Sequence, residues 1–130
     1  MSGSAEPHPQ SPALRIMMMP RDVNAQGTIF GGVILSAIDQ AGAIEARRTG
    51  RDHVVTVAMD QVEFKQPVYI GDVLSLCTET IHTGRTSVRV RVVVWADRWN
   101  APHDRVKVTQ AEVTYVAVDE QRRPISIRPG

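Results

Sequence analysis

The segment that begins near Gly31 constrains the fold of this chain more than any other. It is apolar almost throughout and ends by Arg48–Gly50, where arginines complement the negative end of a helix dipole and a glycine favours termination. Small residues keep the predicted helix narrow: Gly32, Ala37, Ala41, Gly42 and Ala43. An exposed helix would carry a clean polar face, which this one lacks. We therefore expect a helix that is wrapped by other elements.

The rest of the chain is typical of β-strands, with many β-branched residues and stretches of alternating polarity. The predicted strands are Leu14–Met19, Val54–Phe64, Val73–His82, Thr86–Trp95 and Arg105–Val118. Thr83–Arg85 is predicted to be a hairpin connection, and Asp97–Asp104 a polar loop. One buried helix among these strands indicates an α+β domain in which an antiparallel sheet curls around the helix. Such a sheet keeps open edges, so we expect a dimer or a larger assembly.

Length and charge restrict the possible functions. The 130 residues suffice for one compact domain, and 15 Lys and Arg against 14 Asp and Glu leave a net charge of +1, which is unlike the field of a general nucleic-acid binder. No run approaches the roughly 18 apolar residues that cross a membrane. The single cysteine, Cys77, allows no intrachain disulfide and is expected in the core or an interface. These features predict a cytoplasmic protein that binds neither nucleic acid nor membrane.

The two ends of the chain are predicted to be poorly ordered. Residues 1–12 are polar and proline-rich and lack the apolar centre of a secretory signal, which predicts a disordered tail. The last residues, 125–130, follow a polar turn and are expected to be mobile. The folded domain is predicted to span residues 13–127.

One carboxylate lies inside the apolar helix. Asp39 is two turns from Gly31 among apolar neighbours, where a charge without partners is costly to desolvate. Such residues are often functional. The carboxylate could also face a solvated cleft between subunits, or pair with an arginine such as Arg47 of a neighbouring protomer. From the residues alone, both interpretations remain open.

Several blocks along the chain resemble one family. In order they are Pro20-x-Asp22-x-Asn24-x-x-Gly27-x-Ile-Phe30-Gly-Gly32, Asp39-x-Ala-Gly-Ala43, Val55-Thr-Val57, Phe64-x-x-Pro67-Val, Gly71-Asp72, Gly84-Arg-Thr-Ser87 and Tyr115-Val-Ala-Val-Asp119. Over about residues 14–127 they are similar to the YciA-like acyl-CoA thioesterases of the hotdog fold. The resemblance implies one long helix wrapped by a five- to six-stranded antiparallel sheet, with subunits in a dimer or a trimer of dimers. It also implies hydrolysis of acyl-CoA to free acid and CoA without a cofactor, at sites between two subunits.

The resemblance assigns roles to residues around the helix start. Asp39 matches the family's catalytic carboxylate, as general base or nucleophile, and Asn24 matches an asparagine that serves catalysis in related enzymes. Asn24 could equally support its turn. Gly31 and Gly32 match the family's glycines, whose N–H groups could stabilise an oxyanion, or they could merely pack the helix against the sheet. Because the sites lie between subunits, Asn24 and Asp39 of one site are expected to come from different chains.

Other residues could bind the substrate. The turn formed by Arg85, Thr86 and Ser87 offers a guanidinium, two hydroxyls and loop N–H groups to the phosphates of CoA, although an ordinary hairpin connection could have the same sequence. Phe30 could line the acyl channel or belong to the core. Val33 replaces a bulky aromatic residue of some close relatives, which bears on acyl-chain preference.

Other chemistries have weaker support. The histidines are scattered, so no metal site is expected, and no Gly-x-Ser-x-Gly nucleophile elbow occurs. Hotdog hydratases usually place a histidine beside the catalytic acid, and this helix has none. The main alternative is a non-catalytic acyl-CoA-binding or sensing module, which would keep the CoA-binding turn but is expected to lack the carboxylate.

Overall fold

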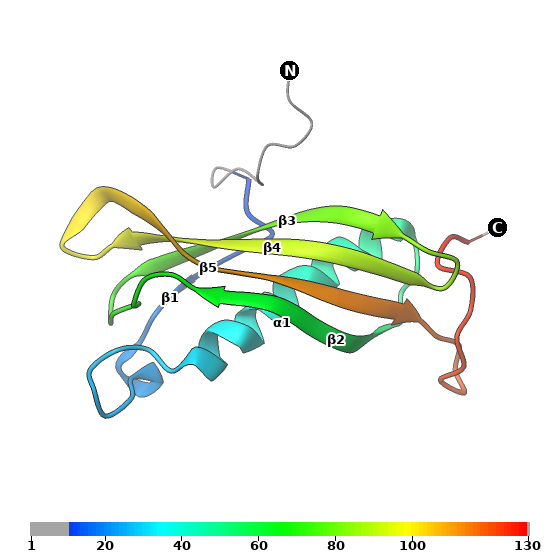
Figure 1. Cartoon of the computed structure of the whole chain (residues 1–130), viewed down its shortest axis with the longest axis horizontal. Helices are drawn as coiled ribbons and strands as arrows, with labels where there is room; N and C mark the ends of the chain where they lie inside the picture. The colour runs from blue at the N-terminus through cyan, green and yellow to red at the C-terminus, as the bar shows by residue number, and fades with distance from the viewer. Residues whose placement is uncertain (1–10, 130) are drawn as a thin grey trace, which may run out of the picture.

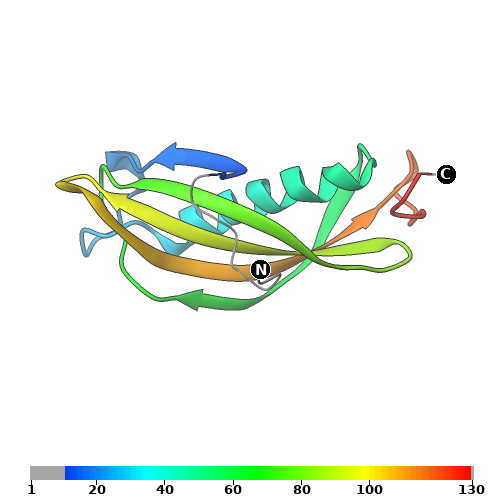
Figure 2. The ribbon, with the colours of Figure 1, turned by 90° about the horizontal axis from the view of Figure 1, so that it is seen from above.

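One helix packs against a five-stranded antiparallel sheet in the computed structural model, which describes residues 11–129. The strands are β1 (Leu14–Met17), β2 (Val54–Phe64), β3 (Val73–Thr83), β4 (Ser87–Arg98) and β5 (Ala101–Ala117). Their order in the sheet is β1-β3-β4-β5-β2, which leaves β2 at one edge. The helix α1 (Gly31–Ala46) lies along one face of the sheet (Figure 1, Figure 2). The predicted α+β architecture is therefore confirmed.

The core lies between α1 and the inner face of the sheet. The buried residues of the helix are Ile34, Ala37, Ile38, Ala41, Gly42 and Ala46. Every second residue of β4 is fully buried opposite the helix: Val88, Val90, Val92, Val94 and Ala96. The helix continues into a single 3-10 turn, Arg47–Thr49, and ends at Gly50, whose φ of 106° favours glycine. The predicted end of the helix is confirmed. The predicted burial holds for the side of the helix that faces the sheet, whereas Gly32, Ser36, Gln40 and Ile44 on the other side are exposed in the single chain.

Charged residues pair across the outer face of the sheet. Arg89 of β4 donates to Glu112 of β5 over 2.8 Å and also bonds Asp60 of β2. Arg91 donates to Glu79 of β3 over 3.1 Å. The alternation in β4 therefore separates a valine face in the core from an arginine face outside it.

Cys77 lies in the middle of β3 and is fully buried. Burial raises the pKa of its thiol, while Arg15 and Arg105 act in the opposite direction. The predicted burial of this cysteine is confirmed.

The segment Asp97–Asp104 was predicted to be a loop, and this prediction is wrong. The strands β4 and β5 continue through it and leave only Trp99 and Asn100 as the turn. Arg105 lies opposite Asp97 and donates to its carboxylate over 2.7 Å. Cross-strand charge pairs of this kind stabilise a polar hairpin that extends beyond the core, so hydrophobic alternation does not reveal it.

The C-terminal segment is held against the sheet, contrary to the predicted mobility of residues 125–130. Ile127 is buried in the core, and its N–H donates to the carbonyl of Arg85 over 2.9 Å. The N–H of Ile125 donates to the carbonyl of Ala117 over 2.9 Å. Residues 1–10 of the predicted tail, and Gly130, lie outside the described residues. The domain limits of 13–127 remain a prediction.

A buried ion pair fixes the loop between β2 and β3. Asp72 is fully buried, and Arg98 of β4 donates to its carboxylate over 2.7 Å. The same carboxylate accepts the N–H groups of Tyr69 and Trp99. Arg98 also donates to the carbonyl of Pro67 over 2.9 Å and lies 5.2 Å from the centre of the Tyr69 ring. The β4–β5 hairpin therefore holds residues 67–72 in place.

Candidate active site

Two hydroxyl groups hold the carboxylate of Asp39. Thr56 of β2 donates to Oδ1 over 2.8 Å, and Tyr115 of β5 donates to the same oxygen over 3.1 Å. The Tyr115 hydroxyl also lies 2.8 Å from the main-chain carbonyl oxygen of Asp39. Among residues 11–129, Oδ2 has no hydrogen-bond partner and no arginine or lysine pairs with this carboxylate. One oxygen is thus fixed, and the other is available to accept a proton.

Tyr115 is a core residue that reaches the helix backbone. It is fully buried, and Gly42 lies against its ring: a Cβ at Gly42 would be 3.0 Å from Cζ and 3.1 Å from Cε2. Burial, followed by the charge and the hydrogen bond of Asp39, raises the pKa of Tyr115 above its ordinary value. The hydroxyl therefore stays protonated and remains a donor at neutral pH.

A bulge in β2 brings Thr56 to Asp39. Thr56 lies opposite Tyr115 and faces the helix, whereas Asp60 pairs with Arg89 on the outer face. Strict alternation would place Thr56 and Asp60 on the same face, and the register shift directly after Thr56 prevents this. Because β2 is an edge strand and Thr56 is exposed, the Asp39 carboxylate lies at the open flank between α1 and that edge.

The two glycines at the start of α1 have different surroundings. A Cβ on Gly31 would lie 3.3 Å from the ring of Phe64, whereas one on Gly32 would meet nothing within 4 Å. Packing inside the chain thus explains why residue 31 has no side chain, but it does not explain the glycine at position 32. The N–H groups of both residues have no acceptor inside the helix, so they can bind a ligand.

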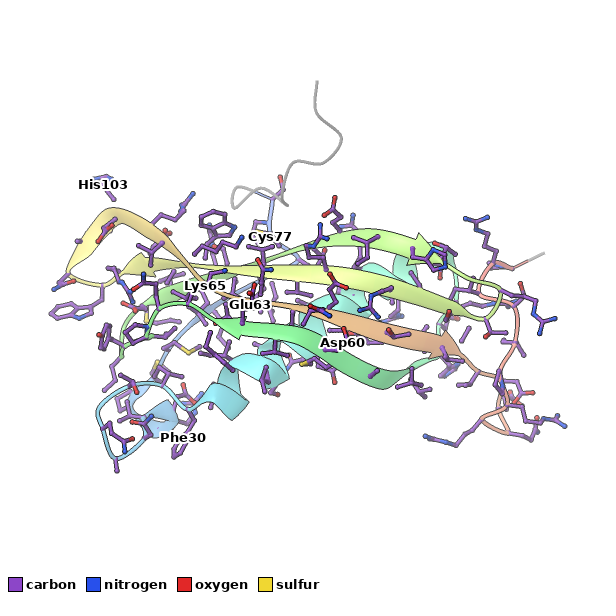
Figure 3. All side chains as sticks on the ribbon, in the orientation of Figure 1. Phe30, Asp60, Glu63, Lys65, Cys77 and His103 are labelled. Atoms are coloured by element: carbon purple, nitrogen blue, oxygen red, sulfur yellow. The ribbon has the colours of Figure 1, made fainter. Side chains whose placement is uncertain are left out.

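An apolar pocket of about 350 Å³ opens beside the helix start. Its lining residues are Thr28, Ile29, Gly31, Ile34, Phe64, Lys65, Gln66, Pro67 and Val68. Phe30 does not line this pocket or belong to the core, because 52% of it is exposed. Figure 3 shows Phe30 at the start of α1, on the side away from the strands.

Asn24 stabilises its own turn. Its Oδ1 accepts the N–H groups of Gln26 and Thr28 over 2.9 and 3.1 Å, and its Nδ2 donates to the Thr28 hydroxyl over 2.9 Å. No hydrogen bond joins it to Asp39 within the described chain, and the helical rise places Asp39 about 12 Å along α1 from the helix start. A single chain therefore does not bring Asn24 and Asp39 together.

The predicted CoA-binding turn lies at the opposite end of the helix. The connection from β3 to β4 is beside the C-terminal end of α1 (Figure 1), about 24 Å from the helix start. The carbonyls of Arg85 and Thr86 accept the N–H groups of Ile127 and Ala117, both over 2.9 Å. The side chain of Arg85 is exposed, and Ser87 is partly buried. Within one chain this turn does not meet Gly31, Gly32 or Asp39.

Thr56 and Tyr115 were not predicted as site residues, although both occur in blocks that resemble the family. The sequence does carry a signal for Tyr115, because a tyrosine on the inner face of a core strand needs a partner for its hydroxyl. Thr56 has no comparable signal, since threonine is common in strands. Sequence patterns alone therefore located the carboxylate but not the groups that hold it.

No three His, Cys, Asp or Glu side chains in residues 11–129 gather so as to hold a metal ion. No helix in the same residues has the length and apolar character to cross a membrane.

Comparison with known proteins relates this geometry to a family. Residues 26–98 match the family model of the Thioesterase superfamily. The chain is 39% identical over 113 residues to the acyl-CoA thioester hydrolase YciA of Escherichia coli strain K12, with 85% of this chain and 86% of that protein covered.

Solved structures of thioesterases share the fold. The hexameric hotdog fold thioesterase of Campylobacter jejuni is 47% identical with a TM-score of 0.82, with 88% of this chain and 90% of that one covered. HI0827, described as a hexameric broad specificity acyl-coenzyme A thioesterase and solved as a variant with one aspartate changed to alanine, is 38% identical. Its TM-score is 0.85, with 90% of this chain and 86% of that one covered. Since the family model matches more than half of the chain and the relatives cover most of it, the protein is a hotdog-fold member of the Thioesterase superfamily.

Proposed function

We propose that the protein hydrolyses the thioester bond of acyl-CoA and releases a carboxylic acid and CoA. The observation that carries this proposal is the Asp39 carboxylate, which has one oxygen fixed and one free at an open flank of the helix. Relatives named as acyl-CoA thioester hydrolases support it. The aspartate that was replaced in one of the solved relatives agrees with a reaction that depends on a carboxylate.

In the proposed reaction Asp39 acts as a general base. Oδ2 accepts a proton from a water molecule, and the water oxygen attacks the carbonyl carbon of the thioester. The carbonyl oxygen becomes an oxyanion, which the N–H groups of Gly31 and Gly32 stabilise at the positive end of a helix dipole. Collapse of this intermediate breaks the C–S bond, and the proton passes to the sulfur of CoA. Water is the only co-reactant, so the reaction needs no cofactor.

The working site in this proposal contains parts of two subunits. Within one helix, Asp39 is about 12 Å from the glycine N–H groups, too far for both to act on one carbonyl group. An assembly that places the helix start of one subunit beside Asp39 of another supplies both groups. Asn24 precedes the helix start, so it accompanies the glycines. The edge strand β2 exposes Val57 and Val62, which supports pairing of subunits into a dimer or a trimer of dimers.

The acyl chain and the nucleotide use separate surfaces. The pocket beside Gly31 suits an apolar acyl chain, and the exposed ring of Phe30 offers a second apolar contact outside this pocket. The turn of Arg85, Thr86 and Ser87 provides a guanidinium and two hydroxyls for the phosphates of CoA. Among residues 11–129, Arg85 forms no ion pair, which leaves its charge available to the substrate.

A panel of acyl-CoA substrates, scored by release of free thiol, tests the proposed function. We expect the protein to release CoA from at least one acyl chain length, at a rate proportional to protein concentration. The heat-denatured protein is the control for spontaneous hydrolysis. If no acyl-CoA is hydrolysed although one binds, the protein is instead a non-catalytic acyl-CoA-binding module.

Mixing two inactive variants tests whether the site is shared. We expect Asn24→Ala and Asp39→Ala to be inactive alone and to recover about a quarter of the activity after dissociation and reassembly as an equal mixture. Half of the random dimers contain both variants, and one of their two sites has neither substitution. Each variant reassembled alone is the control. No recovery in proven mixed assemblies would contradict a site that takes Asn24 and Asp39 from different chains.

A further inference from the structure

We infer that Tyr115 is a positioning residue for the reaction: it is buried in the core, out of reach of the substrate, and its hydroxyl fixes the carboxylate of Asp39. The inference rests on the proposed function.

The first observation is that one hydroxyl contacts two parts of the same residue. The Tyr115 oxygen lies 2.8 Å from the main-chain oxygen of Asp39 and 3.1 Å from its Oδ1. The one hydroxyl proton is shared between the two oxygens, so Tyr115 ties the side chain of Asp39 to the helix backbone and restricts rotation about its χ angles. Thr56, the register partner of Tyr115 in the sheet, donates to the same Oδ1, so Oδ2 is left without a hydrogen-bond partner among residues 11–129.

The second observation is that Gly42 has no side chain and leaves the space that Tyr115 occupies. Gly42 is three residues after Asp39, so the two lie on neighbouring parts of one helix face. A side chain at Gly42 would overlap the Tyr115 hydroxyl and press on its ring. Glycine weakens the interior of a helix compared with alanine, and this close approach accounts for its presence in α1.

The third observation is that neighbouring strands enclose Tyr115 on both sides. Tyr115 is fully buried in β5, where Val88 of β4 lies opposite it on one side and Thr56 of β2 on the other. Because the donor belongs to a core strand, its hydrogen bond fixes where the carboxylate lies relative to the core. A base that must meet a water molecule and a carbonyl carbon together is sensitive to displacements of about 1 Å.

Tyr115→Phe tests this inference, because it removes the hydroxyl and keeps the ring. We expect kcat to fall about 10- to 100-fold while KM changes less than about threefold, since the substrate surfaces are untouched. Thr109→Val is the matched control. Thr109 is also fully buried in β5, and its hydroxyl has no hydrogen-bond partner among residues 11–129. The control is expected to keep kcat within about twofold, and both variants are expected to keep the assembly size and far-UV spectrum of the unsubstituted protein.

A double substitution shows whether Tyr115 acts through Asp39. In Asp39→Asn protein, adding Tyr115→Phe is expected to lower the residual activity no further, because the base is already gone. A kcat of Tyr115→Phe within about twofold of the unsubstituted protein would overturn the inference. So would an equal loss of kcat in Thr109→Val, or an equal further loss in the Asp39→Asn background. Absence of turnover by the unsubstituted protein would instead overturn the proposed function on which the inference rests.

Discussion

Asp39→Asn is expected to lower kcat for acyl-CoA hydrolysis by about 10²- to 10⁴-fold, the usual contribution of a general base. The amide oxygen of asparagine can still accept hydrogen bonds from Thr56 and Tyr115, which now hold Oδ1. The NH₂ group that replaces Oδ2 cannot take a proton from water. The local structure is therefore kept while the chemistry is removed. Steady-state thiol release with the best substrate of the panel measures the effect.

Asp60→Asn is the matched control for this substitution. Asp60 is a second carboxylate, on β2 and not on the helix, and it lies on the outer face of the sheet in an ion pair with Arg89. We expect kcat of this control to stay within about threefold of the unsubstituted value, because an exposed ion pair contributes little to the stability of the fold. Hydrolysis at the unsubstituted rate by Asp39→Asn would rule out the proposed role of Asp39, although the protein could still be a thioesterase.

Arg98→Met is expected to lower the free energy of unfolding by about 3 kcal/mol, at the lower end of the range for a broken buried ion pair. The substitution leaves the fully buried Asp72 carboxylate without its cation. The N–H groups of Tyr69 and Trp99 still donate to it and limit the loss. Denaturant unfolding at fixed protein concentration measures the change. Because Arg98 also bonds the carbonyl of Pro67, which lines the acyl pocket, KM for long acyl chains is expected to rise as well.

Arg105→Met provides the comparison for Arg98→Met. Arg105 pairs with Asp97 in the same β4–β5 hairpin, but its side chain is 34% exposed, against 13% for Arg98. Water can replace the lost cation in the exposed pair, so we expect little or no change in stability. Equal stability losses in the two variants would show that burial of Asp72 does not set the strength of its ion pair.

The fold could be predicted largely because the core elements follow simple periodicities. The small and apolar residues of 31–46 predict a helix that packs in the core with one side, and β2 begins at Val54 and ends at Phe64, as the β-branched run predicts. The β4–β5 hairpin could not be predicted in this way, because Asp97 and Arg105 stabilise it by pairing across strands and not by facing a core. The packing of Ile127 also depends on a contact with a distant turn, at Arg85.

The candidate site was predictable only where its signal is local. A charged residue among apolar helix residues identifies Asp39 from its neighbours in sequence. Its hydrogen-bond donors are 17 and 76 residues away, so no local pattern reveals Thr56 or Tyr115. The bulge that turns Thr56 toward the helix depends on the pairing of β2 with β5. Proximity of Asn24 to Asp39 depends on a second subunit and remains a prediction.

Because Cys77 is buried, a disulfide dye that follows turnover detects the thiol of released CoA. Such dyes react with thiolates, and the one cysteine of this chain is enclosed in the sheet with its pKa raised by burial. The native protein therefore contributes no rapid background signal. Enzyme can be mixed with substrate at nearly equal concentrations, so the release of CoA in a single turnover can be recorded directly.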